Sequence, residues 1–189
     1  MKYSLQFRIW HWFNAFIILG LLGTVFLRKT FLSWRSNSEL LIQQLSTFDI
    51  NITQEQAKIV AKAIRAGMWE WHIILGYALA FFLLYRVVLF FVDSSQKSSF
   101  SSLTPHKKIV KLSYYLFYLL TFFMSVSGLV IHFYELLSLS KDTAHEIKEA
   151  HEFIYNFFLF FVPIHILGVI VAESRDEKGL ISSMVNGEA

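Results

Sequence analysis

The 189-residue sequence contains no cysteine and only two prolines. The absence of cysteine excludes cysteine-ligated iron–sulfur clusters and the covalent attachment of a c-type haem, and it leaves no disulfide from which to infer a redox compartment. Charge is also sparse, because Asp, Glu, Lys and Arg together make up 16% of the residues. The remainder is strongly apolar, with 55% hydrophobic residues, 20 phenylalanines and a mean hydropathy of +0.49. A soluble domain of this size rarely has such a composition.

The apolar residues fall into four blocks of about 20 residues, the length of helix that crosses a bilayer. The blocks are 9–27, 73–92, 112–133 and 153–172. They do not alternate apolar and polar residues as lipid-facing strands do. We therefore expect an all-α integral membrane protein, a four-helix transmembrane bundle forming a single domain over residues 1–189. The first block is not typical of a cleaved signal peptide, because no small-x-small site follows it.

The longest connection between the blocks, residues 28–71, is expected to be extramembrane. Its segments 38–45 and 57–64 have amphipathic helical spacing, and the capping-box sequence TQEQ (residues 53–56) precedes the second. Gly67 is expected to end that helix. We expect two short helices on one membrane surface, and a solvated loop without a partner is an equally open alternative. The other connections are expected to be a flexible Ser-rich linker (94–102), a short acidic connection (135–150) and a polar tail (174–187).

The orientation in the membrane follows from the distribution of Lys and Arg. Four spans place both termini on one side, and cations are nearly equal in number on the two sides. Most of those on the far side lie in the long connection, whereas the positive-inside rule counts short loops near span ends. We therefore expect a multi-pass membrane protein with cytoplasmic termini.

Four histidines lie near the ends of these blocks. His151 and His165 enclose the apolar run of the fourth block, HEFIYNFFLFFVPIH. Their separation is close to four helical turns, so both imidazoles project from nearly the same face, roughly 21 Å apart. His11 lies near the start of the first block and His72 near the start of the second, each beside tryptophans that favour the membrane interface.

Depth in the bilayer sorts these histidines into two pairs, His11 with His165 and His72 with His151. Neutral imidazole is a good axial ligand, so each pair could hold one haem iron from both faces of the porphyrin. Two axial ligands leave no open coordination site, which suits electron transfer. A lone interfacial histidine is more often a polar anchor than a ligand, so this interpretation depends on the pairing.

Other polar and small residues have more than one interpretation. His106 and His145 are expected to be solvated, and His132 to be an interfacial anchor, with contact to a haem propionate as the alternative. Four cations could pair with propionates or with lipid headgroups, and the two alternatives are equally open: Arg8, Arg28, Lys29 and Arg35. Glycines that could let a helix or a flat cofactor approach closely are Gly20, Gly23 and Gly76. Small residues suited to tight helix packing are Ser125, Ser127 and Gly128.

Three motifs resemble the bacterial cytochrome b561 family, which includes the b-type cytochrome subunits of nickel–iron hydrogenases. They are RIWHWFN (8–14), WEWH (69–72) and HEFIY…PIH (151–165), and the tail at 178–187 is similar to the family's C-terminal signature. The resemblance covers essentially the whole chain and implies a protein of the bacterial inner membrane. It implies a four-helix bundle with two b haems that exchanges electrons with quinone, with ligands at the positions of His11, His72, His151 and His165. The long first connection departs from the family pattern and leaves the partner's identity open.

We therefore expect a dihaem b-type membrane cytochrome that transfers electrons between the quinone pool and a redox partner at the membrane surface. The partner would be a periplasmic or membrane-attached hydrogenase, dehydrogenase or cytochrome c, and neither the resemblance nor the composition indicates nucleic-acid binding. One alternative is a stand-alone superoxide:quinone oxidoreductase of the same family type. Its cationic funnel would come from Arg28, Lys29, Arg35, Lys58, Lys62 and Arg65. A metal or proton transporter is a weaker alternative, because it predicts polar or acidic groups inside the spans and, apart from the histidines, mid-span charge is nearly absent.

Overall fold

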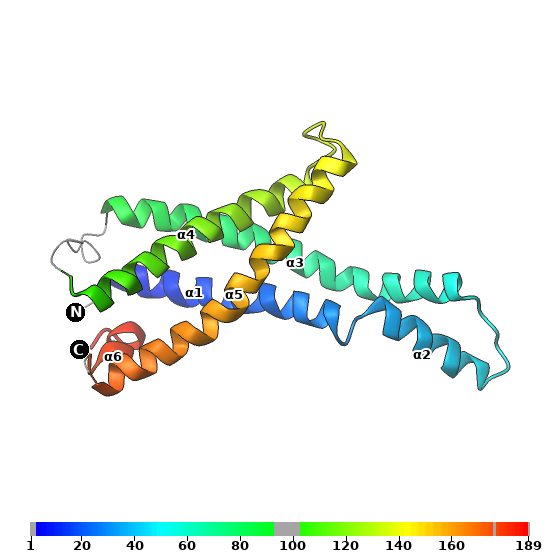
Figure 1. Cartoon of the computed structure of the whole chain (residues 1–189), viewed down its shortest axis with the longest axis horizontal. Coiled ribbons are helices and arrows are strands. Elements are labelled where there is room, and N and C mark those ends of the chain that lie inside the picture. The colour runs from blue at the N-terminus through cyan, green and yellow to red at the C-terminus, as the bar shows by residue number, and fades with distance from the viewer. Residues whose placement is uncertain (1–2, 93–102, 176, 189) are drawn as a thin grey trace. The chain divides into compact units, whose positions relative to one another are not determined.

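The computed structural model describes residues 3–92, 103–175 and 177–188, and these residues form helices joined by short connections (Figure 1). In chain order the helices are α1 (Leu5–Lys29), α2 (Trp34–Ser46), α3 (Gln54–Val92), α4 (Pro105–His132), α5 (Lys141–Arg175) and α6 (Leu180–Val185). The described residues contain no strand. The all-α fold class is therefore confirmed.

The predicted membrane spans correspond to the long helices. Within the described part of the chain, α1, α3, α4 and α5 are long and apolar enough to cross a membrane. Each predicted apolar block lies inside one of them to within one residue. A helix satisfies its own backbone hydrogen bonds, which lipid cannot do. Large apolar side chains such as Phe16, Phe81 and Phe153 are exposed on these helices, as expected for surfaces that lipid covers.

The chain divides into two compact units, of which the first comprises Met1–Ile17 and Gly76–Ala189. In this unit α4 packs against α5, and α5 packs against α6 (Figure 1). The start of α1 meets the end of α3 in a cluster built on buried Phe7, Trp10 and Leu89. The indole Nε1 of Trp10 donates a hydrogen bond of 2.8 Å to the carbonyl of Phe82. This bond links α1 to α3.

A single arginine holds three aromatic rings together at this cluster. The guanidinium carbon of Arg86 lies 5.2 Å from the ring centroid of Phe7 and 5.3 Å from those of Trp10 and Tyr118. Its Nε also donates a hydrogen bond of 3.2 Å to the Tyr118 hydroxyl. Cation–π contacts strengthen when they are removed from water. The charge of Arg86 thus stabilises the contact among α1, α3 and α4.

The C-terminal tail is partly helical rather than only a polar extension. A carboxylate from α5, Glu173, accepts hydrogen bonds from the backbone amides of Gly179 (2.9 Å) and Ile181 (2.8 Å). These amides lie at the start of α6, where helix N–H groups lack partners within the helix. Glu173 therefore caps α6 from the neighbouring helix.

The tail helix also contacts the start of α1. Trp12 donates from its indole to the carbonyl of Met184 (3.2 Å), and Arg8 donates from Nη1 to the carbonyl of Val185 (3.2 Å). A Cβ on Gly187 would stand 2.9 Å from the guanidinium carbon of Arg8. Arg8, expected to contact a propionate or a lipid headgroup, thus contacts the protein's own C-terminal segment.

The second unit, Ile18–Leu75, contains the rest of α1, α2 and the first part of α3. Ser38 of α2 and Ala57 and Ala61 of α3 have no exposed surface. Because these side chains are small, α2 and the first part of α3 can approach each other closely. Helix α2 confirms the amphipathic helix predicted over residues 38–45.

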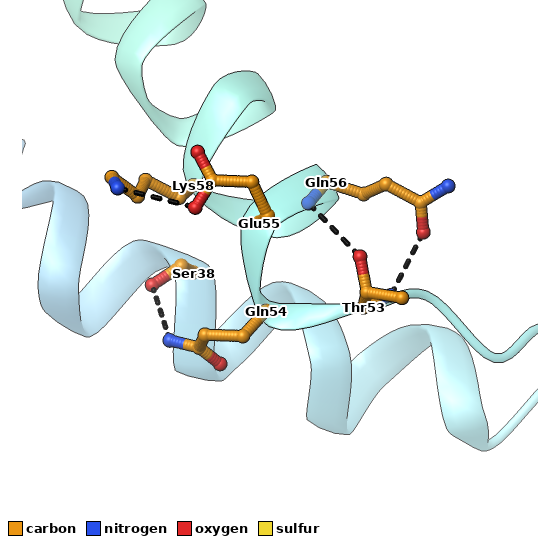
Figure 2. Close-up of polar contacts among 6 residues, drawn as sticks. All are labelled: Ser38, Thr53, Gln54, Glu55, Gln56 and Lys58. Carbon is orange, nitrogen blue, oxygen red and sulfur yellow. Dashed lines mark hydrogen bonds and ion pairs between the residues drawn. The ribbon is translucent and has the colours of Figure 1, made fainter.

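The predicted capping box is present at the start of α3 (Figure 2). The hydroxyl of Thr53 accepts a hydrogen bond from the Gln56 amide (3.3 Å), and the Gln56 side chain accepts one from the Thr53 amide (2.8 Å). Lys58 forms an ion pair with Glu55 at 3.2 Å, and Gln54 donates to the Ser38 hydroxyl of α2 at 3.5 Å. The helix start is therefore anchored both within itself and to α2.

Two predicted boundaries are wrong. Gly67 does not end a helix, because α3 runs from Gln54 to Val92 without a break. A glycine inside a helix costs only about 1 kcal/mol, and no proline or turn sequence comes after it to stop propagation. The acidic connection at 135–150 is also shorter than expected, since α5 begins at Lys141. Asp142 lies in the first turn of α5, where negative charge favours the helix dipole. The predicted linker at 94–102 lies outside the described residues.

Substituting Thr53 by Ala should loosen the first turn of α3, because the Gln56 amide loses its acceptor. A lost N-cap costs about 1 kcal/mol, which corresponds to roughly fivefold faster opening. Hydrogen exchange of the peptide covering residues 53–60 in detergent measures this effect. Thr47→Ala is the matched control, because the Thr47 hydroxyl donates to the Gln44 carbonyl and caps no amide. Equal exchange in both variants would contradict the prediction.

Candidate functional site

His11 and His165, predicted as one ligand pair, lie side by side in the first unit. Their ring centroids are 6.3 Å apart, with an angle of 53° between the planes. Phe161 stacks parallel to His165 at 5.9 Å, and Tyr114 meets it edge-on at 6.0 Å. Trp12 meets His11 edge-on at 5.3 Å. Helices α1 and α5 thus bring two imidazoles together among aromatic side chains.

The separation of these rings fits two axial ligands of one haem iron. A bond from a metal to an imidazole nitrogen is about 2 Å long, so two imidazoles on opposite sides of one metal have centroids roughly 6 Å apart. The Nδ1 atom of His11 is buried, and no described residue hydrogen-bonds to it. A buried polar atom without a partner is costly. The pair is therefore suited to a site that a further group completes.

His72 is oriented by residues of the second unit. Its Nδ1 lies 2.8 Å from the hydroxyl of Thr24 on α1, and that hydroxyl donates a hydrogen bond of 2.7 Å to the Leu21 carbonyl. Trp69 stacks on the imidazole, with centroids 4.9 Å apart and planes 14° apart. The guanidinium carbon of Arg28 lies 5.2 Å from the Trp69 ring centroid. His72 therefore has a fixed hydrogen-bond partner and a covered face.

His151 is oriented by α4 in the first unit. Its Nδ1 lies 2.8 Å from the hydroxyl of Ser127, and that hydroxyl donates a hydrogen bond of 2.7 Å to the Phe123 carbonyl. A Cβ on the next residue, Gly128, would stand 3.4 Å from Cε1 of His151. The imidazole therefore lies against α4 at this glycine, and the serine beside it holds the ring nitrogen.

The pairing of His72 with His151 remains a prediction from their depth in the sequence. His72 belongs to the second unit and His151 to the first. Helix α3 begins well before His72, at Gln54, and the place of His72 near the start of the membrane span remains a prediction. His72 therefore lies within a continuous helix rather than at a helix end.

Two residues of the site, Thr24 and Ser127, are not evident as functional residues from the sequence. The pattern of small residues marks Ser127 only as a packing position and does not mark Thr24. Both are nearly buried, 8% and 4% exposed, within strongly apolar helices. A hydroxyl that is buried in a span needs a hydrogen-bond partner. The signal that the sequence offers is therefore a threonine or serine inside an apolar block. The close approach predicted at Gly20 is present, since a Cβ there would stand 2.9 Å from Leu75.

The remaining histidines have other surroundings. His106 is exposed, and His145 is exposed with its Nδ1 3.7 Å from Glu149, in agreement with the expectation for both. His132 meets Tyr77 edge-on at 5.9 Å. Within the described ranges, no group of three or more His, Asp and Glu side chains has the geometry to hold a metal ion.

Cations of the second unit surround one indole. Side-chain cations of Arg35, Lys58 and Lys62 lie 4.9, 5.7 and 5.9 Å from the ring centroid of Trp34. These three residues belong to the predicted cationic set. They form a positive surface at α2 and the start of α3, and such a surface attracts anions.

Comparison with known proteins assigns the family. A family model described as prokaryotic cytochrome b561 matches residues 2–187, a range that includes all four predicted ligands. Comparisons with curated proteins and with solved structures gave no match. The match agrees with the motifs around His11, His72, His151 and His165 and with the four apolar helices. The chain therefore belongs to the prokaryotic cytochrome b561 family and is a b-type membrane cytochrome of electron transfer.

Proposed function

We propose that this protein is a dihaem cytochrome that transfers electrons between the quinone pool and a redox partner at the membrane surface. The observation that carries the proposal is the His11–His165 pair, two imidazoles from α1 and α5 with centroids 6.3 Å apart. His72 and His151 are proposed as the second ligand pair. Haem b supplies one-electron redox chemistry when it is bound.

The residues around the four histidines support haem binding for electron transfer rather than for dioxygen chemistry. Paired histidines would hold the iron from both sides of a haem, and such a haem would offer dioxygen no coordination site. Phe161 and Tyr114 flank His165 with aromatic rings. Thr24 and Ser127 orient His72 and His151. An apolar, aromatic surrounding keeps the dielectric low, which tunes the redox potential.

We propose a single cytochrome domain in the bacterial inner membrane, with cytoplasmic termini. The distribution of cations in the short connections supports this orientation. The partner would be a hydrogenase, a dehydrogenase or a cytochrome c. Helix α2 and the start of α3 are the proposed docking surface, because Arg35, Lys58 and Lys62 make it positive.

The same positive surface supports a second candidate function, oxidation of superoxide with quinone as the electron acceptor. Superoxide is a small anion, and a cationic surface raises its local concentration and its rate of encounter. This function differs from the first in needing no partner protein.

Replacing one proposed ligand should remove one haem and spare the other. The purified protein should give two b haems per chain in a pyridine haemochrome assay, and His11→Ala, His165→Ala, His72→Ala and His151→Ala should each give about one, because an iron with one missing axial ligand binds weakly. His106→Ala and His145→Ala are matched controls, since both side chains are exposed.

The haem counts separate the possible outcomes of that experiment. One haem in the unmodified protein would leave a single ligand pair. A full count in every histidine variant, or a haem lost in His106→Ala, would contradict the ligand assignment. Absence of haem from the unmodified protein would contradict the proposed function itself.

The two candidate functions differ in superoxide-dependent quinone reduction by the purified chain alone. If superoxide is the substrate, the Lys58→Gln and Lys62→Gln double variant should slow the reaction severalfold at low salt, and the difference should shrink at about 0.5 M salt because the field is screened. Lys148→Gln is the control, a lysine of α5 outside that surface and paired with Glu152. No reaction without a partner protein would exclude the superoxide function and favour the first candidate.

A further inference from the structure

Two of the proposed ligands share an arrangement that the family assignment does not specify. At both His72 and His151, a buried hydroxyl from a neighbouring helix contacts Nδ1 of the imidazole. The same hydroxyl also donates a hydrogen bond to a backbone carbonyl of the helix that carries the hydroxyl. We propose that Thr24 and Ser127 are positioning residues that hold a proton on Nδ1 of His72 and of His151 and thereby lower the reduction potential of the iron that these histidines bind. This inference rests on the proposed function, in which both histidines are haem ligands.

The position of each proton follows from the number of donors. A hydroxyl has one proton to donate and two lone pairs that accept, whereas a carbonyl only accepts. The Thr24 hydroxyl lies 2.7 Å from the Leu21 carbonyl and 2.8 Å from Nδ1 of His72. When its proton is donated to the carbonyl, its oxygen can only accept from the imidazole. The proton of neutral His72 is then on Nδ1, and Nε2 keeps the lone pair that a metal requires.

The same reasoning applies to His151. The Ser127 hydroxyl donates to the Phe123 carbonyl at 2.7 Å and stands 2.8 Å from Nδ1 of the imidazole. The ring lies against α4 at Gly128, where a Cβ would stand 3.4 Å from its Cε1. Two helices that differ in sequence thus place a hydroxyl against the same ring atom, in each case with its own proton engaged by the preceding turn.

The burial of both hydroxyls strengthens their hydrogen bonds to the two imidazoles. Thr24 is 8% exposed and Ser127 is 4% exposed, and hydrogen bonds are electrostatically stronger away from water. A histidine that donates from its other ring nitrogen becomes a more basic ligand. A more basic ligand favours the oxidised, more positively charged iron, so the reduction potential falls. His11 differs, because no described residue hydrogen-bonds to its Nδ1.

The test is a redox titration of the full-length, haem-loaded protein in Thr24→Val and Ser127→Ala variants, followed by absorbance. Each variant should keep both haems and raise one midpoint potential while leaving the other unchanged. We expect the oxidised-to-reduced ratio of the affected haem at a fixed potential to change about tenfold, which is about 59 mV for a one-electron couple. Thr24→Ser and Ser127→Thr should restore the original midpoint, because each keeps a hydroxyl.

The matched control is Thr121→Val. Thr121 is 2% exposed on α4, and its hydroxyl donates to the Phe117 carbonyl at 2.7 Å. Thr121 therefore has a buried hydroxyl that donates to a carbonyl of its own helix, as Thr24 and Ser127 do. Among the described contacts, its hydroxyl has none with a histidine. Both midpoints should therefore be unchanged in this variant.

The outcomes distinguish this inference from the proposed function. Absence of haem from the unmodified protein would overturn both, whereas normal haem content with unchanged midpoints in Thr24→Val and Ser127→Ala would overturn only the inference. Loss of one haem in Thr24→Val that Thr24→Ser restores would support it, since the hydroxyl would then be the group that the ligand needs. Loss of a haem in both Thr24→Val and Thr24→Ser would overturn the inference. A shift of a midpoint potential in Thr121→Val as large as that in Thr24→Val or Ser127→Ala would also overturn it.

Discussion

The contacts of four imidazoles within apolar helices are the feature on which the arrangement of this protein depends. Lipid offers no hydrogen bonds, and an unpartnered polar group in such surroundings is costly. At His72 and His151 a hydroxyl from another helix contacts Nδ1. At His11 and His165 the two rings face each other among aromatic side chains. The contacts of the four histidines therefore join α1 to α3, α4 to α5 and α1 to α5.

Aromatic rings and cations organise both units in a second way. In the first unit Arg86 lies among Phe7, Trp10 and Tyr118 and joins three helices close to the start of α1. In the second unit three cations surround Trp34 at the start of α2. Both arrangements place positive charge beside a ring face, where the attraction strengthens on partial removal from water. The first serves packing, whereas the second leaves its cations at a surface where an anion or an acidic partner can reach them.

The departures from expectation have local physical causes. A glycine such as Gly67 ends a helix only when the next residues cannot continue it, and here residues that favour a helix lead directly into the apolar block. The acidic residues near 142–149 suggest a loop because they are charged, but negative charge near a helix start is stabilising. The tail helix α6 is too short to be stable alone; the carboxylate of Glu173 and the contacts with Arg8 and Trp12 hold it.

The sequence by itself determined the four apolar helices, the capping box at Thr53 and the positions of the four histidines, because apolar length, local backbone chemistry and residue identity are properties of a single segment. Only the tertiary structure decided that Thr24 contacts His72, that Ser127 contacts His151, and that the rings of His11 and His165 lie 6.3 Å apart. These contacts join residues distant in the chain, and their geometry depends on helix rotation and depth. A shift of one residue turns a helical side chain by about 100°, so hydropathy alone cannot select a hydrogen-bond partner.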